Sequence, residues 1–145
     1  MLLRVVLPVL TLLLGLACCP IPIPRQGLLR PDLEITVTDA GGAPVPGVEV
    51  ILRRTIAAPG PATEIARFVT LTDEHGVARF DRAEVTDTVM PLMMHGVPYI
   101  DFEICAQTEA ASASGWVDAG LEDAPSTLAL VLDPAGPLCP PAPAP

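Results

Sequence analysis

The sequence predicts an all-β fold, an antiparallel β-sandwich of about seven short strands, and three observations lead to this prediction. Apolar residues recur at every second position through the middle of the chain, which is the period of a strand with one buried face. Short clusters of glycine, proline and aspartate interrupt these runs, as turns between strands do. No stretch combines a 3.6-residue apolar period with helix caps. The alternation also indicates that each sheet has one face in water.

Seven runs account for the predicted strands. In the first, Leu33, Ile35 and Val37 alternate with polar residues, which places three apolar side chains on one face. The runs are Leu33–Thr38, Val48–Arg53, Ile65–Thr72, Val77–Phe80, Ile100–Cys105, a strand that begins at Trp116, and Leu128–Leu132. The predicted turns lie at Asp39–Gly42, Pro46–Gly47, Pro59–Pro61, Asp73–Gly76 and Asp123–Pro125.

Residues 1–17 have the form of a secretory signal peptide. Arg4 gives a short basic region, and an apolar run from Val5 to Ala17 follows it. A helix of this length spans about 20 Å, which is short of the ~30 Å hydrocarbon core of a bilayer. We therefore expect an exported chain rather than a membrane-spanning one.

The end of this segment resembles the bacterial lipobox, in which a cysteine thiol receives diacylglycerol before cleavage. The matching residues are Leu14-Gly15-Leu16-Ala17-Cys18, although Gly15 stands where leucine is commonest in that motif. The resemblance implies a bacterial lipoprotein anchored through Cys18, with Cys19 as the second candidate acceptor. Because no aspartate follows the cysteine, it also implies sorting to the outer membrane, facing the periplasm or the cell surface. Ordinary cleavage after Ala17, giving a secreted or periplasmic soluble protein, is the alternative.

The mature chain divides into three parts. Residues 18–31 hold the lipid attachment and a proline-rich tether, because alternating proline favours extended polyproline II. Residues 32–133 have the length of one small domain and form the predicted β-sandwich. Residues 134–145 are a Pro/Ala-rich tail, which we expect to be extended and to contribute nothing to a core.

The composition excludes several functions. The net charge is -9, and phosphate backbones repel such a surface, so we expect no nucleic-acid partner. The chain contains neither lysine nor asparagine, which excludes Schiff-base chemistry, the Walker lysine and N-glycosylation. The remaining expected contacts are a membrane, through the lipid, and an unidentified protein or glycan partner.

The two later cysteines fit an oxidising compartment. A disulfide between Cys105 and Cys139 would tie the tail to the domain. The alternative is that Cys105 is a small buried hydrophobe and Cys139 is free.

Two segments resemble carboxypeptidase regulatory-like domains. Residues 35–50 match a strand, a glycine turn and a Pro-Val-x-Gly bend that leads into a second strand. Residues 70–80 resemble the family's Thr-Asp-x-x-Gly-x-x-x-Phe segment, and residues 81–133 match more weakly. The resemblance implies a transthyretin-like, seven-stranded Greek-key sandwich that is usually non-catalytic. From the residues alone, Asp73 is expected to accept hydrogen bonds within its turn, and Gly76 to close a hairpin in a left-handed conformation.

Two groups of residues are candidate metal ligands. Met90, Met93, Met94 and His95 would suit Cu(I), which prefers soft ligands, although an apolar loop in residues 90–95 explains the same pattern. Carboxylates of predicted loops would suit Ca²⁺, yet they show no EF-hand spacing and are expected to be solvated turn residues. The acidic candidates are Asp39, Asp73, Glu74, Asp81 and Asp87.

Catalysis is not expected. The serines Ser112, Ser114 and Ser126 lie in no G-x-S-x-G motif, and the spacing of His75 and His95 suggests no triad. Trp116 and Tyr99 are the candidate platforms for a carbohydrate, with half-buried packing as the alternative for Trp116. The sequence therefore predicts a non-catalytic, lipid-anchored envelope protein without cofactors, which presents a β-sandwich for structural or partner-binding roles. A periplasmic small-ligand or copper carrier that uses residues 90–95 is the alternative.

Overall fold

The computed structural model describes residues 23–57, 62–89, 99–118 and 127–142. Most of them belong to one compact unit, formed by residues 26–85 and 98–145. The second unit comprises residues 1–25 and 86–97, and its described part is limited to the outer ends of two strands.

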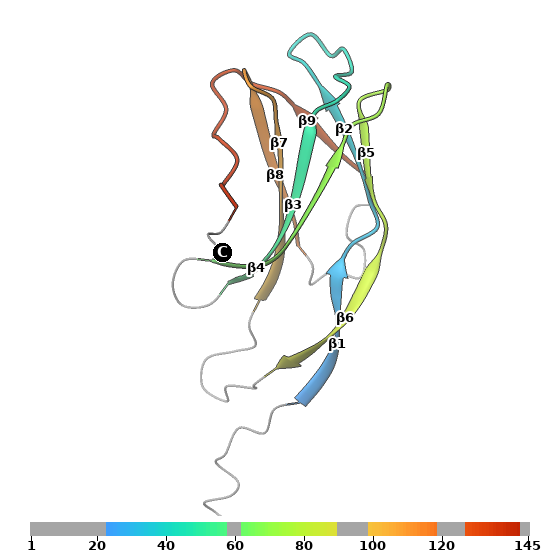
Figure 1. Ribbon diagram of the computed structural model, residues 1–145, viewed down its shortest axis with the longest axis vertical. Coiled ribbons are helices and arrows are strands. Elements are labelled where there is room, and N and C mark those ends of the chain that lie inside the picture. The colour runs from blue at the N-terminus through green and yellow to red at the C-terminus, as the bar shows by residue number, and fades with distance from the viewer. Residues whose placement is uncertain (1–22, 58–61, 90–98, 119–126, 143–145) are drawn as a thin grey trace, which may run out of the picture. The chain divides into compact units, whose positions relative to one another are not determined.

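The described residues form nine strands and no helix, as the sequence predicts for an all-β fold (Figure 1). None of the described elements is a helix long and apolar enough to cross a membrane. The strands are β1 (Ile23–Arg30), β2 (Leu33–Thr38), β3 (Glu49–Ala57), β4 (Thr63–Leu71), β5 (Val77–Phe80), β6 (Ala83–Val89), β7 (Tyr99–Gln107), β8 (Ser112–Asp118) and β9 (Thr127–Val131).

Three sheets contain these strands. One sheet has the order β5-β2-β9, a second has the order β4-β3-β7-β8, and β1 and β6 form a pair. In Figure 1, β2, β5 and β9 occupy one layer, and β3, β4, β7 and β8 occupy another. The four-stranded sheet is antiparallel throughout, with a bulge in β4, where Ile65 is the extra residue opposite Arg54 and Thr55 of β3.

One hydrophobic core lies between the three-stranded and the four-stranded sheet. Leu33, Ile35 and Val37 alternate with half-buried residues along β2, as predicted from their spacing. Phe102 and Ile104 of β7 belong to the same cluster from the opposite sheet. The buried area of such side chains supplies the main driving force for a fold without helices.

The direction of the last strand differs from the sequence prediction of an antiparallel fold. Strand β9 runs parallel to β2, with Ile35 opposite Leu128 and Val37 opposite Leu130. Between β8 and β9 the chain passes from one sheet to the other, so the two strands need no hairpin. An alternating pattern determines which face is buried but not the direction in which the strand runs.

The two segments that carry the family resemblance pack against each other. Gly76 has a φ of 73°, and its carbonyl oxygen accepts a hydrogen bond of 2.8 Å from the Val37 amide. A Cβ at this position would lie 2.7 Å from the Val37 carbonyl oxygen, so only glycine fits. The turn closes no hairpin, contrary to expectation, because β4 and β5 belong to different sheets. It is a corner between the sheets.

Strand β1 lies where the sequence predicted the end of the tether. Residues 23–30 form a strand that pairs with β6, within the segment 18–31 that the sequence assigned to the lipid attachment and a proline-rich tether. A two-stranded sheet has only edges, which accommodate proline. At the end of β1, Leu28 packs against the core, and the Arg30 guanidinium lies 5.2 Å from the centre of the Phe68 ring. Arg30 also donates a hydrogen bond from Nε to the Asp81 carbonyl oxygen.

Candidate functional site

The outer face of the four-stranded sheet carries two adjacent rows of side chains that cross β3, β7 and β8. Register places Ile51 opposite Cys105, and Cys105 opposite Ser114. The next row on the same face is Arg53, Glu103 and Trp116. Because side chains two residues apart share a face, the two rows are neighbours.

The C-terminal strap, defined as residues 134–142, crosses the first of these rows. The disulfide between Cys105 and Cys139 joins it to β7, with the two Cα atoms 5.7 Å apart. Ile51, Cys105 and Cys139 form a buried cluster separate from the main core. The tail therefore contributes a side chain to a buried cluster, where the sequence predicted that it would bury nothing.

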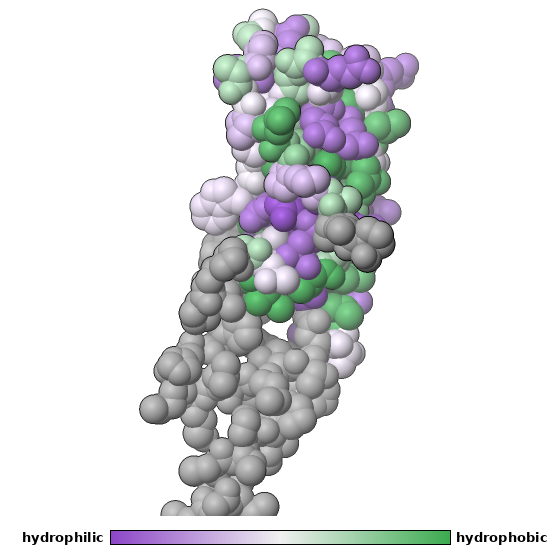
Figure 2. Space-filling model, turned by 60° about the vertical axis from the view of Figure 1, so that its left-hand side comes forward, coloured by the Kyte–Doolittle hydropathy of each residue, from purple (hydrophilic) through white to green (hydrophobic). Residues whose placement is uncertain are grey.

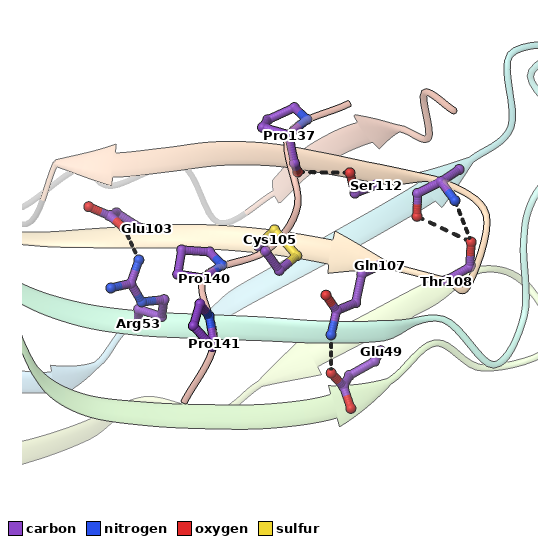
Figure 3. The surroundings of a disulfide bond; sticks show 12 residues. Glu49, Arg53, Glu103, Cys105, Gln107, Thr108, Ser112, Pro137, Pro140 and Pro141 are labelled. Carbon is purple, nitrogen blue, oxygen red and sulfur yellow. Dashed lines mark hydrogen bonds and ion pairs between the residues drawn. A yellow bond between two sulfur atoms is a disulfide. The ribbon is translucent and has the colours of Figure 1, made fainter. Parts of the chain in front are cut away.

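Side chains of β4 and β8 donate hydrogen bonds to carbonyl oxygens of the strap. Ser112 Oγ on β8 donates to the Pro137 carbonyl at 2.8 Å, and Arg67 Nη2 on β4 donates to the Pro140 and Pro141 carbonyls at 3.1 and 2.9 Å. Proline has no N–H group, so these residues present acceptors alone. Figure 3 shows the strap running across the strands from Pro137, past Cys105, to Pro141. The strap covers the sheet without extending it.

Four charged residues form an ion-pair cluster beside the strap. Arg53 bridges Glu64 and Glu103, and Arg67 forms a second pair with Glu64 at 2.8 Å. Hydrogen bonds from Arg67 and then Arg53 outweigh the effect of burial and lower the pKa of Glu64 from 4.5 to about 2. The hydrogen bond with Glu64 raises the pKa of Arg67. These pairs hold the Arg53 guanidinium in place at the edge of a groove.

The groove lies between the strap and the second row of side chains, and its volume is about 460 Å³. Pro137, Leu138 and Pro140 of the strap line the groove together with Trp116 of β8. Trp116 is 70% exposed, so its ring lies open to solvent rather than half-buried. Asp101, Glu103, Arg53 and Ser114 supply the polar groups of the lining. Figure 2 shows hydrophilic and hydrophobic residues interspersed over the described part of the side that carries the strap.

Two of the predicted acidic candidates, Asp39 and Asp73, accept hydrogen bonds within the turns in which they lie. Asp39 Oδ1 accepts hydrogen bonds from the amides of Gly41 and Ala43. Asp73 Oδ1 accepts from the amides of His75 and Val77, and these backbone bonds, followed by the contact with Arg79, lower its pKa. Within the described residues, no group of three or more histidine, cysteine or acidic side chains is arranged to hold a metal ion.

The nucleophile candidates do not come together in the described part of the chain. Ser112 is buried under the strap, whereas Ser114 is exposed in the groove. His75 lies in an exposed turn, where it pairs with Glu74 at 3.5 Å. Ser114 and Trp116 of β8 thus both line the groove, and His75 is not among its lining residues.

Several predicted residues lie outside the described part of the structure. They are the lipidation candidates Cys18 and Cys19, the Met-rich segment with Met90, Met93, Met94 and His95, and Ser126. Tyr99 and Asp87 lie within strands, but their side chains are not described.

Sequence reasoning missed the polar half of the groove. Arg53 and Glu103 are 50 residues apart in the sequence. The position of each on a predicted strand indicates that its side chain faces solvent, but it does not reveal that the two side chains pair with each other. The nearest sequence signal was Ile51, an apolar residue on a face predicted to be wet. Such a residue indicates that another segment covers that face.

Comparisons with known proteins identify no relative. No family model matches the chain, and a search of curated proteins finds no match.

Proposed function

We propose that this chain is an exported, lipid-anchored protein of the bacterial cell envelope, whose β domain presents a binding surface to a partner and catalyses no reaction. Residues 1–18 support export and acylation, because a basic start, a short apolar run and a small residue precede Cys18. Several acyl chains anchor a protein firmly, whereas one gives marginal binding. The partner would then meet the domain at a membrane surface.

The fold proposed for this domain is the seven-stranded Greek-key sandwich that the carboxypeptidase regulatory-like resemblance implies. The sheets β5-β2-β9 and β4-β3-β7-β8 contain seven described strands and share one core, which supports this assignment. The contact between Gly76 and Val37 supports it further, because it joins the two segments on which the resemblance rests.

The disulfide between Cys105 and Cys139 is the observation that carries the proposal. Disulfides form and persist in oxidising compartments and are rare in the bacterial cytosol. Here the bond holds the strap that forms one side of the groove, so the candidate site depends on oxidation. An exported domain would acquire this bond as it matures.

Labelling with radioactive palmitate tests the anchor. The full chain is expressed in a Gram-negative bacterium as wild type, Cys18→Ser and Cys19→Ser, and each is examined for label and for membrane association. We expect label in the wild type and in Cys19→Ser, and none in Cys18→Ser. Label that persists in Cys18→Ser would assign the lipid to another residue, and an unlabelled wild type would overturn the anchor.

A further inference from the structure

We propose that the groove between Trp116 and the strap binds a neutral saccharide. This deepens the proposed function by naming the chemistry of the partner. The groove, its exposed aromatic ring and the polar groups around that ring are the observations that lead to it.

Trp116 provides an apolar platform. It is the single tryptophan of the chain, and it is 70% exposed on the edge strand β8 although the domain has an apolar core. The electron-rich face of an indole attracts the weakly positive C–H groups that line one face of a pyranose ring. Leu138, which is 90% exposed, also lines the groove and adds a second apolar contact.

The polar lining fits hydroxyl groups, which both donate and accept hydrogen bonds. Asp101 and Glu103 provide acceptors, Arg53 provides donors, and the Ser114 hydroxyl provides either. Arg53 is already held by Glu64 and Glu103, so its orientation is fixed before a ligand arrives. Fixed polar groups in a pocket give orientation and specificity.

Charge and size argue against other ligands. Two carboxylates and one guanidinium line the groove in a chain of net charge -9, which disfavours anionic ligands. Grooves for proline-rich peptides are lined by several aromatic rings, and the described groove has one. Its volume of about 460 Å³ lies within the range of small-molecule sites.

Titration of the mature protein with neutral tetrasaccharides tests the proposal. The probes are the β-1,4-linked tetramers of N-acetylglucosamine and of glucose and the α-1,4-linked tetramer of glucose. Because Trp116 is the single tryptophan, its fluorescence reports a ligand that stacks on it. We expect at least one probe to give a saturable change with a dissociation constant of about 1 mM or tighter.

Calorimetry on variants locates the binding. We expect Trp116→Ala to weaken it by about tenfold or more, and Trp116→Phe to keep most of it because an aromatic face remains. Leu71→Ala is the matched control, since Leu71 is exposed on the same sheet but outside the groove. Far-ultraviolet dichroism checks that each variant is folded.

Two results would overturn the saccharide site. One is that none of the three saccharides shows saturable binding when its concentration is raised to about 10 mM. Binding of a proline-rich peptide in place of the saccharides would have the same meaning. The other is an equal loss of affinity in Trp116→Ala and Leu71→Ala. Neither result affects palmitate labelling at Cys18, so failure of this site and failure of the anchor are distinguishable.

Discussion

Arg67 on β4 donates a hydrogen bond of 2.9 Å to the carbonyl oxygen of Pro141, a residue 74 positions later in the chain. The same amino group reaches the Pro140 carbonyl, and the guanidinium is also paired with Glu64. One side chain thus links the ion-pair cluster to the strap. The far end of the strap is held by charge-assisted hydrogen bonds, which are stronger than neutral ones.

Removing the disulfide should destabilise the domain. The bond joins residues 34 positions apart, and by lowering the entropy of the unfolded chain it raises the free energy of that state by about 3–4 kcal/mol at 25 °C. We expect Cys105→Ala with Cys139→Ala to lower the free energy of unfolding by about this amount in urea titrations under non-reducing conditions. Ser114→Ala, a change at the exposed neighbour of Cys105, is the control and should stay within about 0.5 kcal/mol of the wild type. Equal stability of the double variant and the wild type would argue against a disulfide-held strap.

Glu64 should make stability depend on pH in acid. Its pKa is about 2 in the folded protein, against 4.5 for the unperturbed group. Its contribution is therefore fully present above about pH 4.5 and is lost as the pH falls toward about 2. Integrated over this shift, the contribution is at most about 3 kcal/mol.

The Glu64→Gln variant isolates this contribution. We expect its free energy of unfolding to lie below that of the wild type at about pH 6, and the gap to narrow as the pH approaches about 2. Glu84→Gln is the control, because Glu84 is exposed in a surface pair with Arg82, and such pairs are worth about 0–1 kcal/mol. A gap between wild type and Glu64→Gln that stays constant with pH would show that Glu64 is not the titrating group.

Gly76→Ala should be more harmful than Gly42→Ala. Both glycines have positive φ, 73° and 83°, so alanine strains the backbone at either position. At Gly76 the added Cβ would also lie 2.7 Å from the Val37 carbonyl oxygen, whereas at Gly42 nothing lies within 4 Å. We expect losses of about 3 kcal/mol for Gly76→Ala and about 1 kcal/mol for Gly42→Ala in thermal unfolding. Equal losses would mean that the corner between the sheets adapts to the added methyl group.

The predicted strands agree best with those of the structure where each strand has one buried face. The predicted Leu33–Thr38 and Val77–Phe80 coincide with β2 and β5. Apolar and polar residues alternate without interruption in β2, and Ala78 and Phe80 are the buried positions of β5. Strands β1 and β6 were missed. Pro24 lies in β1, and in β6 Asp87 interrupts the alternation of Ala83, Val85 and Val89 with polar residues. These two strands form through pairing with each other, which a local pattern does not encode.

The sequence predicted no groove, although residues that line it were among the candidates. Trp116 was a candidate platform from its residue type alone, and the cysteine pair was one of two alternatives. The ion pairs of Arg53 and the course of the strap depend on strand register and on a long-range bond, so no spacing in the sequence reveals them. Ile51 carried the one local signal, an apolar residue on an outward face.

Peptide mapping of the exported protein tests the central claim most directly. Cleavage after glutamate places Cys105 in the fragment 104–109 and Cys139 in the fragment 123–145. After free thiols are blocked, we expect mass spectrometry under non-reducing conditions to find these two fragments joined and to find them separate after reduction. If both fragments are recovered separately from the unreduced exported protein with their cysteines alkylated, the two thiols were free. That result would contradict a strap that is joined to the sheet by a disulfide.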